Sequence, residues 1–529
     1  MSVKIVVGNV YSKIVGHLPD NVHEELNEVL SYWVKGAEHS KSYQNKKWDG
    51  RIRLYNKAMG QSFYSGLLGV VSAILVENHV PHKKIDNRVR PPQNLKHLKF
   101  TPTSSYQERD YQTASIEMGL KKTRGIFKMA TGAGKTTVIT KLISEIKTGP
   151  FMFYVLNTDL LDQAYDTLSA NLNEPIGKIG GGECDIKNIN VCTIQTAIRA
   201  INVDTPNFDI NEYKYDDDDK IYWKAKDIED SERLNNIRKL IRASRGLYLD
   251  EMHHATASTA KSVLTESVNA YWRFGGTATP YREDGAEIVL QALFGKKIVD
   301  ISASFLIERE WLLTPHIFFV PMEHEINYHS YPKTYSHCIS QNDELNTHVA
   351  ELTMSLMDKG LSVLVLVQHY VQGNFIKKII NKKYPEFEFI TGKMNRAKRK
   401  EEIQKVRDKK VMGMAATSLA DEGLDVPTLD VAILAAGGAS CSKTHQRVGR
   451  TIRPDYSVEN RRQDSAVIYY DHKVKHLHDH ALKAKRILKQ EPLFDIKKSK
   501  GIEHLEGEIL KSLKFNEINN INQGSLFDL

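Results

Sequence analysis

The stretch Met129-Ala130-Thr131-Gly132-Ala133-Gly134-Lys135-Thr136-Thr137 largely determines how this 529-residue chain should fold. It follows the apolar run 125–127 and precedes a helix-like run from Val138 to Ile146. A strand, a glycine-bearing turn and a helix in this order bind a nucleoside triphosphate, because the N–H groups of the turn and the helix dipole face the phosphates. An ordinary glycine-rich loop before a helix is the alternative for this segment alone. The predicted ATP-binding residues of the segment are Thr131, Gly132, Ala133, Gly134, Lys135, Thr136 and Thr137.

The side-chain types of this segment and of a later strand predict the chemistry. Lys135 should reach the β- and γ-phosphates, and the Thr136 hydroxyl should ligate Mg²⁺. Residues 247–254 form a short apolar strand that ends in Asp250 and Glu251. We expect Asp250 to hold Mg²⁺ and Glu251 to accept a proton from the attacking water. Such a pair alone is more often a solvated strand end, but after a phosphate loop it indicates an ATPase site.

Two later segments are expected to respond to the nucleotide. Thr277 and Thr279, in the segment 275–280, are candidates for transmitting a change from the ATP site, with a plain turn as the alternative. Arg450 and Arg453 are three residues apart on an expected helix and therefore project from one face. Together with Gln446 they suit a γ-phosphate whose charge spreads in the transition state. An exposed basic helix is the alternative for this segment.

In this order, the segments resemble the motifs of superfamily 2 helicases and translocases of the Asp-Glu-x-His type. Met129 stands where the strict phosphate-loop pattern has glycine, and the form Ala-x-x-Gly-x-Gly-Lys-Thr is the one that nucleic-acid helicases carry. The likeness runs from about residue 106 to residue 453. It implies that Gln112 reads the adenine base, and that Gly423 and Asp425, in a segment similar to the fifth motif, contact ATP.

The same resemblance implies contacts with a nucleic-acid backbone in both halves of the motor. Residues 155–163 and 192–196 resemble strand ends that grip the backbone, and residues 364–369 resemble the start of the second lobe. Gripping of this kind is independent of sequence and sensitive to salt. The predicted contacts are Thr158, Thr193, Gln195, His369, Thr391, Gly392 and Thr417.

The region near the N-terminus narrows the resemblance within the superfamily. Residues 48–55 resemble a segment in the N-terminal domain of UvsW-type phage recombination helicases, which remodel forks, displacement loops and four-way junctions. Residues 279–285 are also similar to the XPB group of repair helicases. Trp48, Arg51 and Arg53 alternate with apolar residues, so one strand face could offer cations and an aromatic ring to DNA. A Trp48 that fills a small core is the alternative.

Composition agrees with a protein that binds a polyanion. The formal net charge is +8, which favours nucleic acid, although many basic proteins bind none. The four cysteines are scattered without metal-ligand spacing, so we expect a reducing cytoplasm, that of the host cell if the chain is viral. We see no signal peptide, and no apolar run approaches the roughly 18 residues that span a bilayer. We expect no membrane association.

The hydrophobic patterns predict an α/β fold class with two tandem RecA-like parallel-sheet domains and a small α+β N-terminal domain. A helix-like run covers residues 22–34 of the N-terminal domain. Paired prolines at 91–92 mark a linker. The predicted boundaries are 1–85 for the DNA-binding N-terminal domain, 86–104 for the linker, 105–300 and 301–480 for the two RecA-like domains, and 481–529 for a basic tail.

Two charged regions leave alternatives open. An acidic insertion at about 204–230 contains four consecutive aspartates and is either a solvated run or a DNA mimic that gates the groove. The run 472–480 is rich in lysine and histidine, and we expect a basic helix along a phosphate backbone or a solvated surface helix. We predict no metal other than Mg²⁺.

These features predict an ATP- and Mg²⁺-dependent DNA helicase or translocase, working as a monomeric motor on branched, forked or single-stranded DNA in recombination, repair or replication. Replication or recombination proteins are possible partners. Two alternatives remain open: a motor subunit of a restriction or repair complex, and an ATP-gated nucleic-acid clamp or RNA-binding switch that separates no strands.

Overall fold

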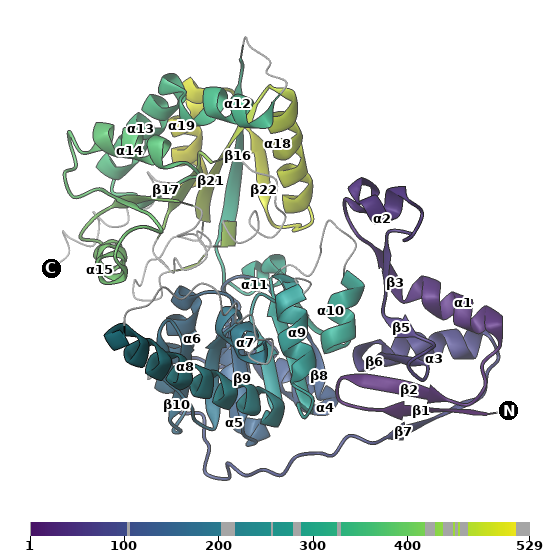
Figure 1. Cartoon of the computed structure of the whole chain (residues 1–529). Helices are drawn as coiled ribbons and strands as arrows, with labels where there is room; N and C mark the ends of the chain where they lie inside the picture. Colours follow the sequence, from purple (N-terminus) through teal and green to yellow (C-terminus); the bar gives the residue numbers. More distant parts are fainter. Residues whose placement is uncertain are drawn as a thin grey trace. The chain divides into compact units, whose positions relative to one another are not determined.

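Figure 1 shows the computed structural model of the chain, which forms two units. The first unit contains residues 1–129 and 134–300, and the second contains residues 130–133 and 301–529. The residues that the structure describes are 2–102, 106–202, 217–254, 258–278, 287–324, 330–417, 429–436, 448–449, 453–454 and 464–514.

The N-terminal domain is a small α+β fold built on one sheet. The strand order is β5-β6-β2-β1-β7, with β1 and β7 parallel and the other pairs antiparallel. Strand β1 alternates buried and exposed side chains because one face of the sheet is covered by helices. These elements are β1 (Val3–Val7), β2 (Tyr11–Val15), α1 (Asp20–Val29), β5 (Tyr55–Asn56), β6 (Ser62–Tyr64), α3 (Leu68–Glu77) and β7 (His82–Asp86).

A projecting segment, residues 31–53, which we call the arm, corrects one expectation. The helix expected at 22–34 ends at Val29, because the chain turns there into a strand, β3 (Ser31–Trp33). Strand β3 pairs antiparallel with β4 (Arg51–Arg53). Between them lie the short helices η1 (Ala37–His39) and α2 (Lys41–Gln44), and the arm extends away from the five-stranded sheet (Figure 1).

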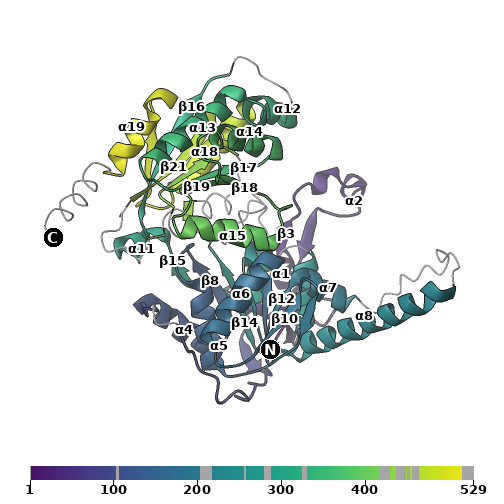
Figure 2. The same cartoon turned by 90° about the vertical axis from the view of Figure 1, so that its left-hand side faces the viewer.

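The first RecA-like domain has a mostly parallel sheet of eight described strands, in the order β11-β10-β12-β9-β13-β14-β8-β15. The central strands are buried on both faces, which explains their continuous apolar sequences. Helices α4 and α5 lie side by side against this sheet (Figure 2). The strands are β8 (Arg124–Met129), β9 (Phe151–Val155), β10 (Ile176–Gly180), β11 (Glu183–Asp185), β12 (Ile189–Thr193), β13 (Gly246–Leu249), β14 (Trp272–Thr277) and β15 (Lys297–Ile301), and the helices are α4 (Asp110–Lys122), α5 (Lys135–Ile146), α6 (Thr158–Asn171), α7 (Ile194–Ile201), α8 (Asp217–Ala243), η4 (Met252–His254), α9 (Ser258–Glu266) and α10 (Glu287–Phe294).

The N-terminal domain and the first RecA-like domain share one apolar core. A single cluster of buried side chains runs from Val3 in β1 to Phe294 in α10. The turn η2 (Ser65–Leu67) packs so closely on α10 that a Cβ at Gly66 would overlap the Gln291 carbonyl oxygen. The domain predicted at 1–85 is therefore fixed to the first RecA-like domain rather than tethered by a free linker.

Polar contacts reinforce this junction. Arg124 donates from Nη2 to the Asn9 carbonyl oxygen at 2.6 Å, and Asn9 Nδ2 donates to the Val268 carbonyl oxygen at 3.2 Å. Burial, together with the nearby charge of Arg273, lowers the pKa of Arg124 to about 9. The guanidinium groups of Arg88 and Arg90, from the segment predicted as a linker, lie over the rings of Tyr271 and Trp272. The segment thus lies against the folded domain.

The second unit carries a seven-stranded sheet in which every described pairing is parallel, in the order β18-β19-β17-β20-β21-β16-β22. Its strands are β16 (Thr314–Met322), β17 (Val363–Val367), β18 (Glu388–Ile390), β19 (Gly413–Thr417), β20 (Val431–Leu434), β21 (Asp464–His472) and β22 (Asp495–Lys498). Its helices are α11 (Ala303–Glu308), α12 (Tyr331–Tyr335), η5 (Ser336–Ser340), α13 (Asp343–Asp358), α14 (Tyr370–Ile380), α15 (Arg396–Arg407), α18 (Lys475–Leu488) and α19 (Ile502–Ser512).

The predicted basic tail at 481–529 is wrong for its described part, because residues 481–514 are built into the second unit. Helix α18 extends to Leu488, and β22 pairs in parallel with β16 at the edge of the sheet. Leu505 and Ile509 of α19 are fully buried in the same core. The second RecA-like domain therefore continues beyond residue 480. Among the described residues, no helix is both long and apolar enough to cross a bilayer.

Candidate active site

The predicted phosphate turn follows β8 and leads directly into α5. Gly132 and Gly134 have φ angles of 89° and 75°, a left-handed conformation that favours glycine. The Ala133 N–H donates to the Ala130 carbonyl oxygen at 3.0 Å and closes the turn. Lys135 is the first residue of α5, so the turn and the helix start place N–H groups and the positive end of a helix dipole together.

The predicted cation and the predicted acid pair meet in the first unit. The Lys135 ammonium lies 3.1 Å from Asp250 Oδ1 and 3.1 Å from Glu251 Oε1. All three side chains are at most one-fifth exposed. Burial alone would lower the pKa of Lys135, but the two carboxylates outweigh that effect and hold the pKa above its ordinary value. The phosphate-loop lysine and the acid pair thus form one site.

The strand order explains how these side chains meet. Strand β14 lies between β8, which precedes Lys135, and β13, which precedes Asp250. A Cβ at Gly276 of β14 would lie 3.0 Å from Lys135 Cδ and would overlap the Tyr248 hydroxyl. Glycine at this position therefore leaves the space across which Lys135 reaches the carboxylates.

The acid pair is held by a strained and hydrogen-bonded backbone. Glu251 has a φ of 48°, which is uncommon for a residue with a side chain and is frequent at functional sites. Asp250 Oδ1 accepts hydrogen bonds from the Glu251 N–H at 3.0 Å and from the Tyr248 hydroxyl at 3.2 Å. The Asp250 carboxylate therefore has two hydrogen bonds besides its contact with Lys135, and the two acids differ in their surroundings.

His253 connects the acid pair to a predicted coupling residue. Its Nδ1 lies 3.2 Å from Thr277 Oγ1 and 3.4 Å from Glu251 Oε2. Thr277 is fully buried at the end of β14. His253 was not among the predicted site residues, although its place in η4, two residues after Glu251, was a usable signal. Thr279, the other predicted coupling residue, lies outside the described residues.

Gln112, the predicted adenine-reading residue, lies beside the phosphate turn. It is in the first turn of α4 and is buried. A Cβ at Gly134 would lie 2.6 Å from Gln112 Nε2, so the side-chain amide packs directly on the turn. Helices α4 and α5 pack together and bring the two residues to one place.

The residues of the site fit Mg²⁺ and a triphosphate. Asp250, Glu251 and the Thr136 hydroxyl offer oxygen atoms, which Mg²⁺ prefers. The glycine turn offers backbone N–H donors, and Lys135 offers a buried ammonium. Thr137 is half-buried in the first turn of α5, next to Thr136.

The predicted backbone contacts of the first unit stand at neighbouring strand ends. Thr158 begins α6 after β9, Thr193 caps α7 by accepting a hydrogen bond from the Thr196 N–H at 3.3 Å, and Gln195 is exposed in the first turn of α7. The turn Gly180–Gly182 between β10 and β11 was not among the predicted contacts, and all three of its φ angles are positive. A Cβ at Gly180 would lie 2.8 Å from Thr193 Oγ1, and one at Gly181 would lie 3.3 Å from Thr158 Cγ2. Three adjacent glycines were the available signal.

The predicted contacts of the second unit also follow the carboxyl ends of parallel strands. His369, exposed before α14, packs on the ring of Tyr335 with 4.8 Å between ring centroids. Thr391 is buried after β18, with Gly392 exposed beside it. Thr417 ends the neighbouring strand β19. The sequence thus placed all four residues on one edge of this sheet.

Several predicted residues lie outside the described part of the chain: the catalytic Gln446 and Arg450, the ATP contacts Gly423 and Asp425, and residues 204–216 of the acidic insertion. The rest of the insertion lies in α8, which covers residues 217–243. Arg453 is described, and burial together with the charge of Arg407 lowers its pKa to about 10.

The predicted DNA contacts in the arm are engaged within the arm itself. Trp48 Nε1 donates to the Arg51 carbonyl oxygen at 2.8 Å. Arg51 Nη1 donates to Ser31 Oγ at 3.0 Å, and Arg53 pairs with Asp49 at 2.5 Å. The hydrogen bond from Arg53 is the main cause that lowers the pKa of Asp49 to about 2. Trp48 is half-buried within the arm and is not part of the core of the five-stranded sheet.

Two protein-family models match the parts of the chain that carry the predicted motifs. Residues 102–282 match the family described as type III restriction enzyme, res subunit, and residues 345–455 match the helicase conserved C-terminal domain. A viral protein named helicase 22, from Sulfolobus islandicus filamentous virus, is 24% identical over 66% of this chain and 62% of its own length. The ATP-dependent DNA helicase uvsW of Enterobacteria phage T4 is 23% identical over 82% of this chain and 84% of its own length.

A solved structure supports the fold class. Yeast (S. cerevisiae) Dbp5, bound to RNA and ADP BeF3, superposes with a TM-score of 0.52 at 12% identity, covering 77% of this chain and 94% of that one. The two sheets predicted from the sequence are confirmed as the tandem α/β domains of this fold. The matched stretch spans 62% of the viral relative's own length.

Proposed function

Because the chain is a superfamily 2 helicase with both domains of the motor, we propose that it is an ATP-dependent DNA helicase that acts on forked and junction DNA. The observation that carries the ATPase part is the contact of Lys135 with Asp250 and Glu251, at 3.1 Å each, across the glycine of β14. The DNA part is supported by the likeness to the T4 DNA helicase over four-fifths of the chain, and the branched-DNA part by the resemblance of residues 48–55 to UvsW-type helicases.

The residues divide the work at the ATP site. Lys135 and the glycine turn hold the phosphates, and Asp250 with Thr136 holds Mg²⁺. Glu251 accepts a proton from the attacking water. Bound Mg²⁺ neutralises phosphate charge. We assign Gln446, Arg450 and Arg453 to the γ-phosphate and Gln112 to the adenine base.

The path from hydrolysis to DNA movement starts at the acid pair in this proposal. His253 contacts both Glu251 and Thr277, so a change at the carboxylate reaches the end of β14 through one side chain. Thr158, Thr193 and the turn 180–182 hold the DNA backbone in the first unit. His369, Thr391, Gly392 and Thr417 do so in the second.

Two measurements test the function. The ATPase rate is compared with single-stranded DNA, duplex DNA, RNA and a four-way junction, and strand separation is followed on a labelled fork and junction. We expect DNA to stimulate hydrolysis and the wild-type chain, but not Lys135→Ala, to unwind or migrate branched DNA. Stronger stimulation by RNA would refute the DNA assignment.

An alternative function is that of a motor within a restriction or repair complex, because residues 102–282 match a restriction-enzyme subunit family. Such a motor would translocate on duplex DNA without resolving the junction. Displacement of a triplex-forming strand from linear duplex, together with an intact junction, would favour it over the helicase.

A further inference from the structure

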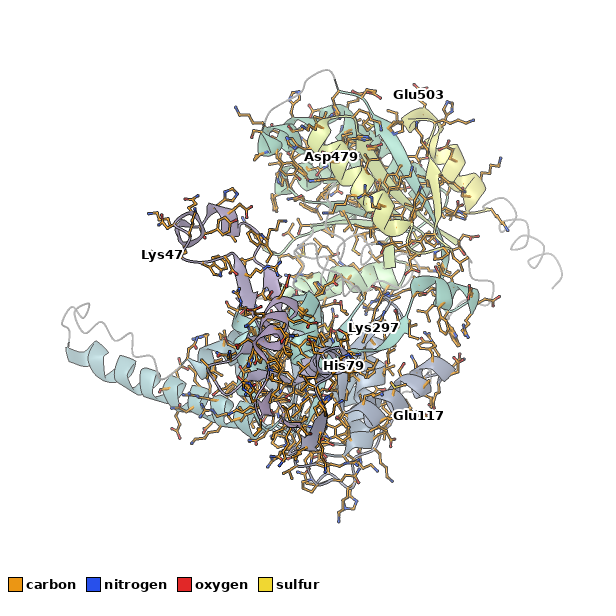
Figure 3. The ribbon with its side chains drawn as sticks, turned by 90° about the vertical axis from the view of Figure 1, so that its right-hand side faces the viewer. Lys47, His79, Glu117, Lys297, Asp479 and Glu503 are labelled. Atoms are coloured by element: carbon orange, nitrogen blue, oxygen red, sulfur yellow. The ribbon has the colours of Figure 1, made fainter. Side chains whose placement is uncertain are left out.

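The arm has an exposed surface that the predicted DNA contacts do not use. Four lysines, Lys35, Lys41, Lys46 and Lys47, are all exposed and have no described ion pair or hydrogen bond of their side chains. Trp48, Arg51 and Arg53 instead hold the arm together. Figure 3 labels Lys47 on the arm, away from the five-stranded sheet. The side chains that are free to bind a partner are therefore the lysines.

The arm is a built structure rather than a loose loop. The Trp33 ring packs edge-on against the Tyr43 ring, with 5.4 Å between the ring centroids. A Cβ at Gly50 would lie 2.5 Å from the Trp33 ring. The Val34 N–H donates to the Gly50 carbonyl oxygen at 2.8 Å. The two ends of the arm are anchored by Leu30 and Leu54, which are buried in the core. The lysines thus occupy fixed positions.

The partner follows from charge and chemistry. Residues 31–53 contain six lysines and arginines against two carboxylates, Glu38 and Asp49, and this excess suits a polyanion. Exposed lysines contact phosphates as point charges, and such contacts need no particular base sequence. The aromatic rings are packed on one another or hydrogen-bonded, so stacking on the bases of a single strand is not their main role.

We propose that the arm is a phosphate-binding element for duplex DNA, in which Lys35, Lys41, Lys46 and Lys47 contact the backbone. The proposal rests on the proposed function for the choice of DNA. Because the N-terminal domain shares a core with the first RecA-like domain, the arm moves as one body with the Lys135 site. The duplex held by the arm therefore follows the ATPase domain through its cycle.

The test measures equilibrium binding of a fluorescent 30-base-pair DNA duplex to the full chain without ATP, across a series of KCl concentrations. The variant replaces Lys35, Lys41, Lys46 and Lys47 with Gln. A matched control replaces Lys83, Lys84, Lys121 and Lys122, which are exposed on the same unit, with Gln. Each phosphate contact contributes about 0.9 to the slope of log K against log salt.

We expect the arm variant to bind duplex at least tenfold more weakly at low salt, with a slope smaller by about 3 to 4, and the control to change much less. Equal effects in both variants would overturn the proposal, as would a loss confined to an RNA duplex of the same length. The assay needs no hydrolysis. A chain that binds duplex through the arm but turns over no ATP would refute the proposed function and leave this inference standing.

Discussion

Among single residues, the ATP site depends on Gly276, whose missing side chain leaves room for Lys135 and Tyr248, and on two neighbouring carboxylates with different surroundings. Both acids contact Lys135, but Asp250 also accepts hydrogen bonds from Tyr248 and from the Glu251 N–H, whereas Glu251 also contacts His253. The different partners explain how adjacent acids can serve one as a metal ligand and the other as a base.

Replacing Glu251 with Gln should separate binding from turnover. The amide keeps the size of the side chain but cannot accept the proton of water, so ATP binding should persist while kcat falls roughly 10²-fold or more. Binding is measured with a fluorescent ATP analogue and turnover by phosphate release. Lys135→Ala should instead lose the binding itself. Retained turnover in Glu251→Gln would show that another group is the base.

Replacing Gly276 with Ala tests the path of Lys135 across β14. The added methyl group would overlap the Tyr248 hydroxyl and crowd Lys135 Cδ, so we expect a lower melting temperature and loss of nucleotide binding. Overpacking of a buried site costs about 1–3 kcal/mol. Gly507→Ala is the matched control, because no atom lies within 4 Å of a Cβ there. Unchanged nucleotide affinity in Gly276→Ala would contradict this role of the glycine.

The phosphate loop and the acid pair could be predicted because their signals are local. Glycines at left-handed positions and Asp-Glu after an apolar strand are visible in a few consecutive residues. The need for glycine at 276 was not visible, since it arises from β14 lying between β8 and β13. The contact of His253 with Thr277, 24 residues later, likewise depends on strand order.

At the scale of elements, short and polar strands were the hardest to predict. Strand β22 has the sequence Asp-Ile-Lys-Lys, which is typical of a charged tail. Its pairing with β16 nevertheless makes it an edge strand of the sheet. Such a strand is defined by a partner about 180 residues away, not by its own apolar pattern. The end of α1 at Val29 was missed because the apolar positions continue into β3.

The packing of η2 on α10 predicts the effect of a substitution at Gly66. Gly66→Leu should separate the N-terminal domain from the first RecA-like domain, because any side chain there overlaps the Gln291 carbonyl oxygen. We expect a lower melting temperature and faster proteolysis between residues 87 and 102. Gly507→Leu is the matched control, because this exposed position in α19 has no positive φ and no atom within 4 Å of a Cβ. Equal stability of both variants would argue against the tight junction.

At the scale of the whole molecule, the N-terminal domain is part of the motor unit rather than an appended reader. The predicted boundary near residue 85 is close to the end of β7 at Asp86, but the apolar core continues across it. Sequence patterns mark where elements end and do not reveal which faces pack together. The size of the first unit was therefore underestimated even though its elements were placed correctly.

Deleting residues 1–85 should consequently destabilise the ATPase domain instead of merely changing its choice of DNA. The deletion exposes the apolar surface of α10 and removes the acceptor that Arg124 uses on Asn9, which leaves a buried guanidinium without that hydrogen bond. We expect a melting temperature lower by several degrees, aggregation and loss of basal ATPase. The matched control shortens only the arm, replacing residues 34–50 with Asn-Gly so that Trp33 and Arg51 keep their pairing. This variant should retain stability and basal ATPase and lose duplex affinity. A stable and active deletion variant would show that the shared core contributes little and that the N-terminal domain is separable after all.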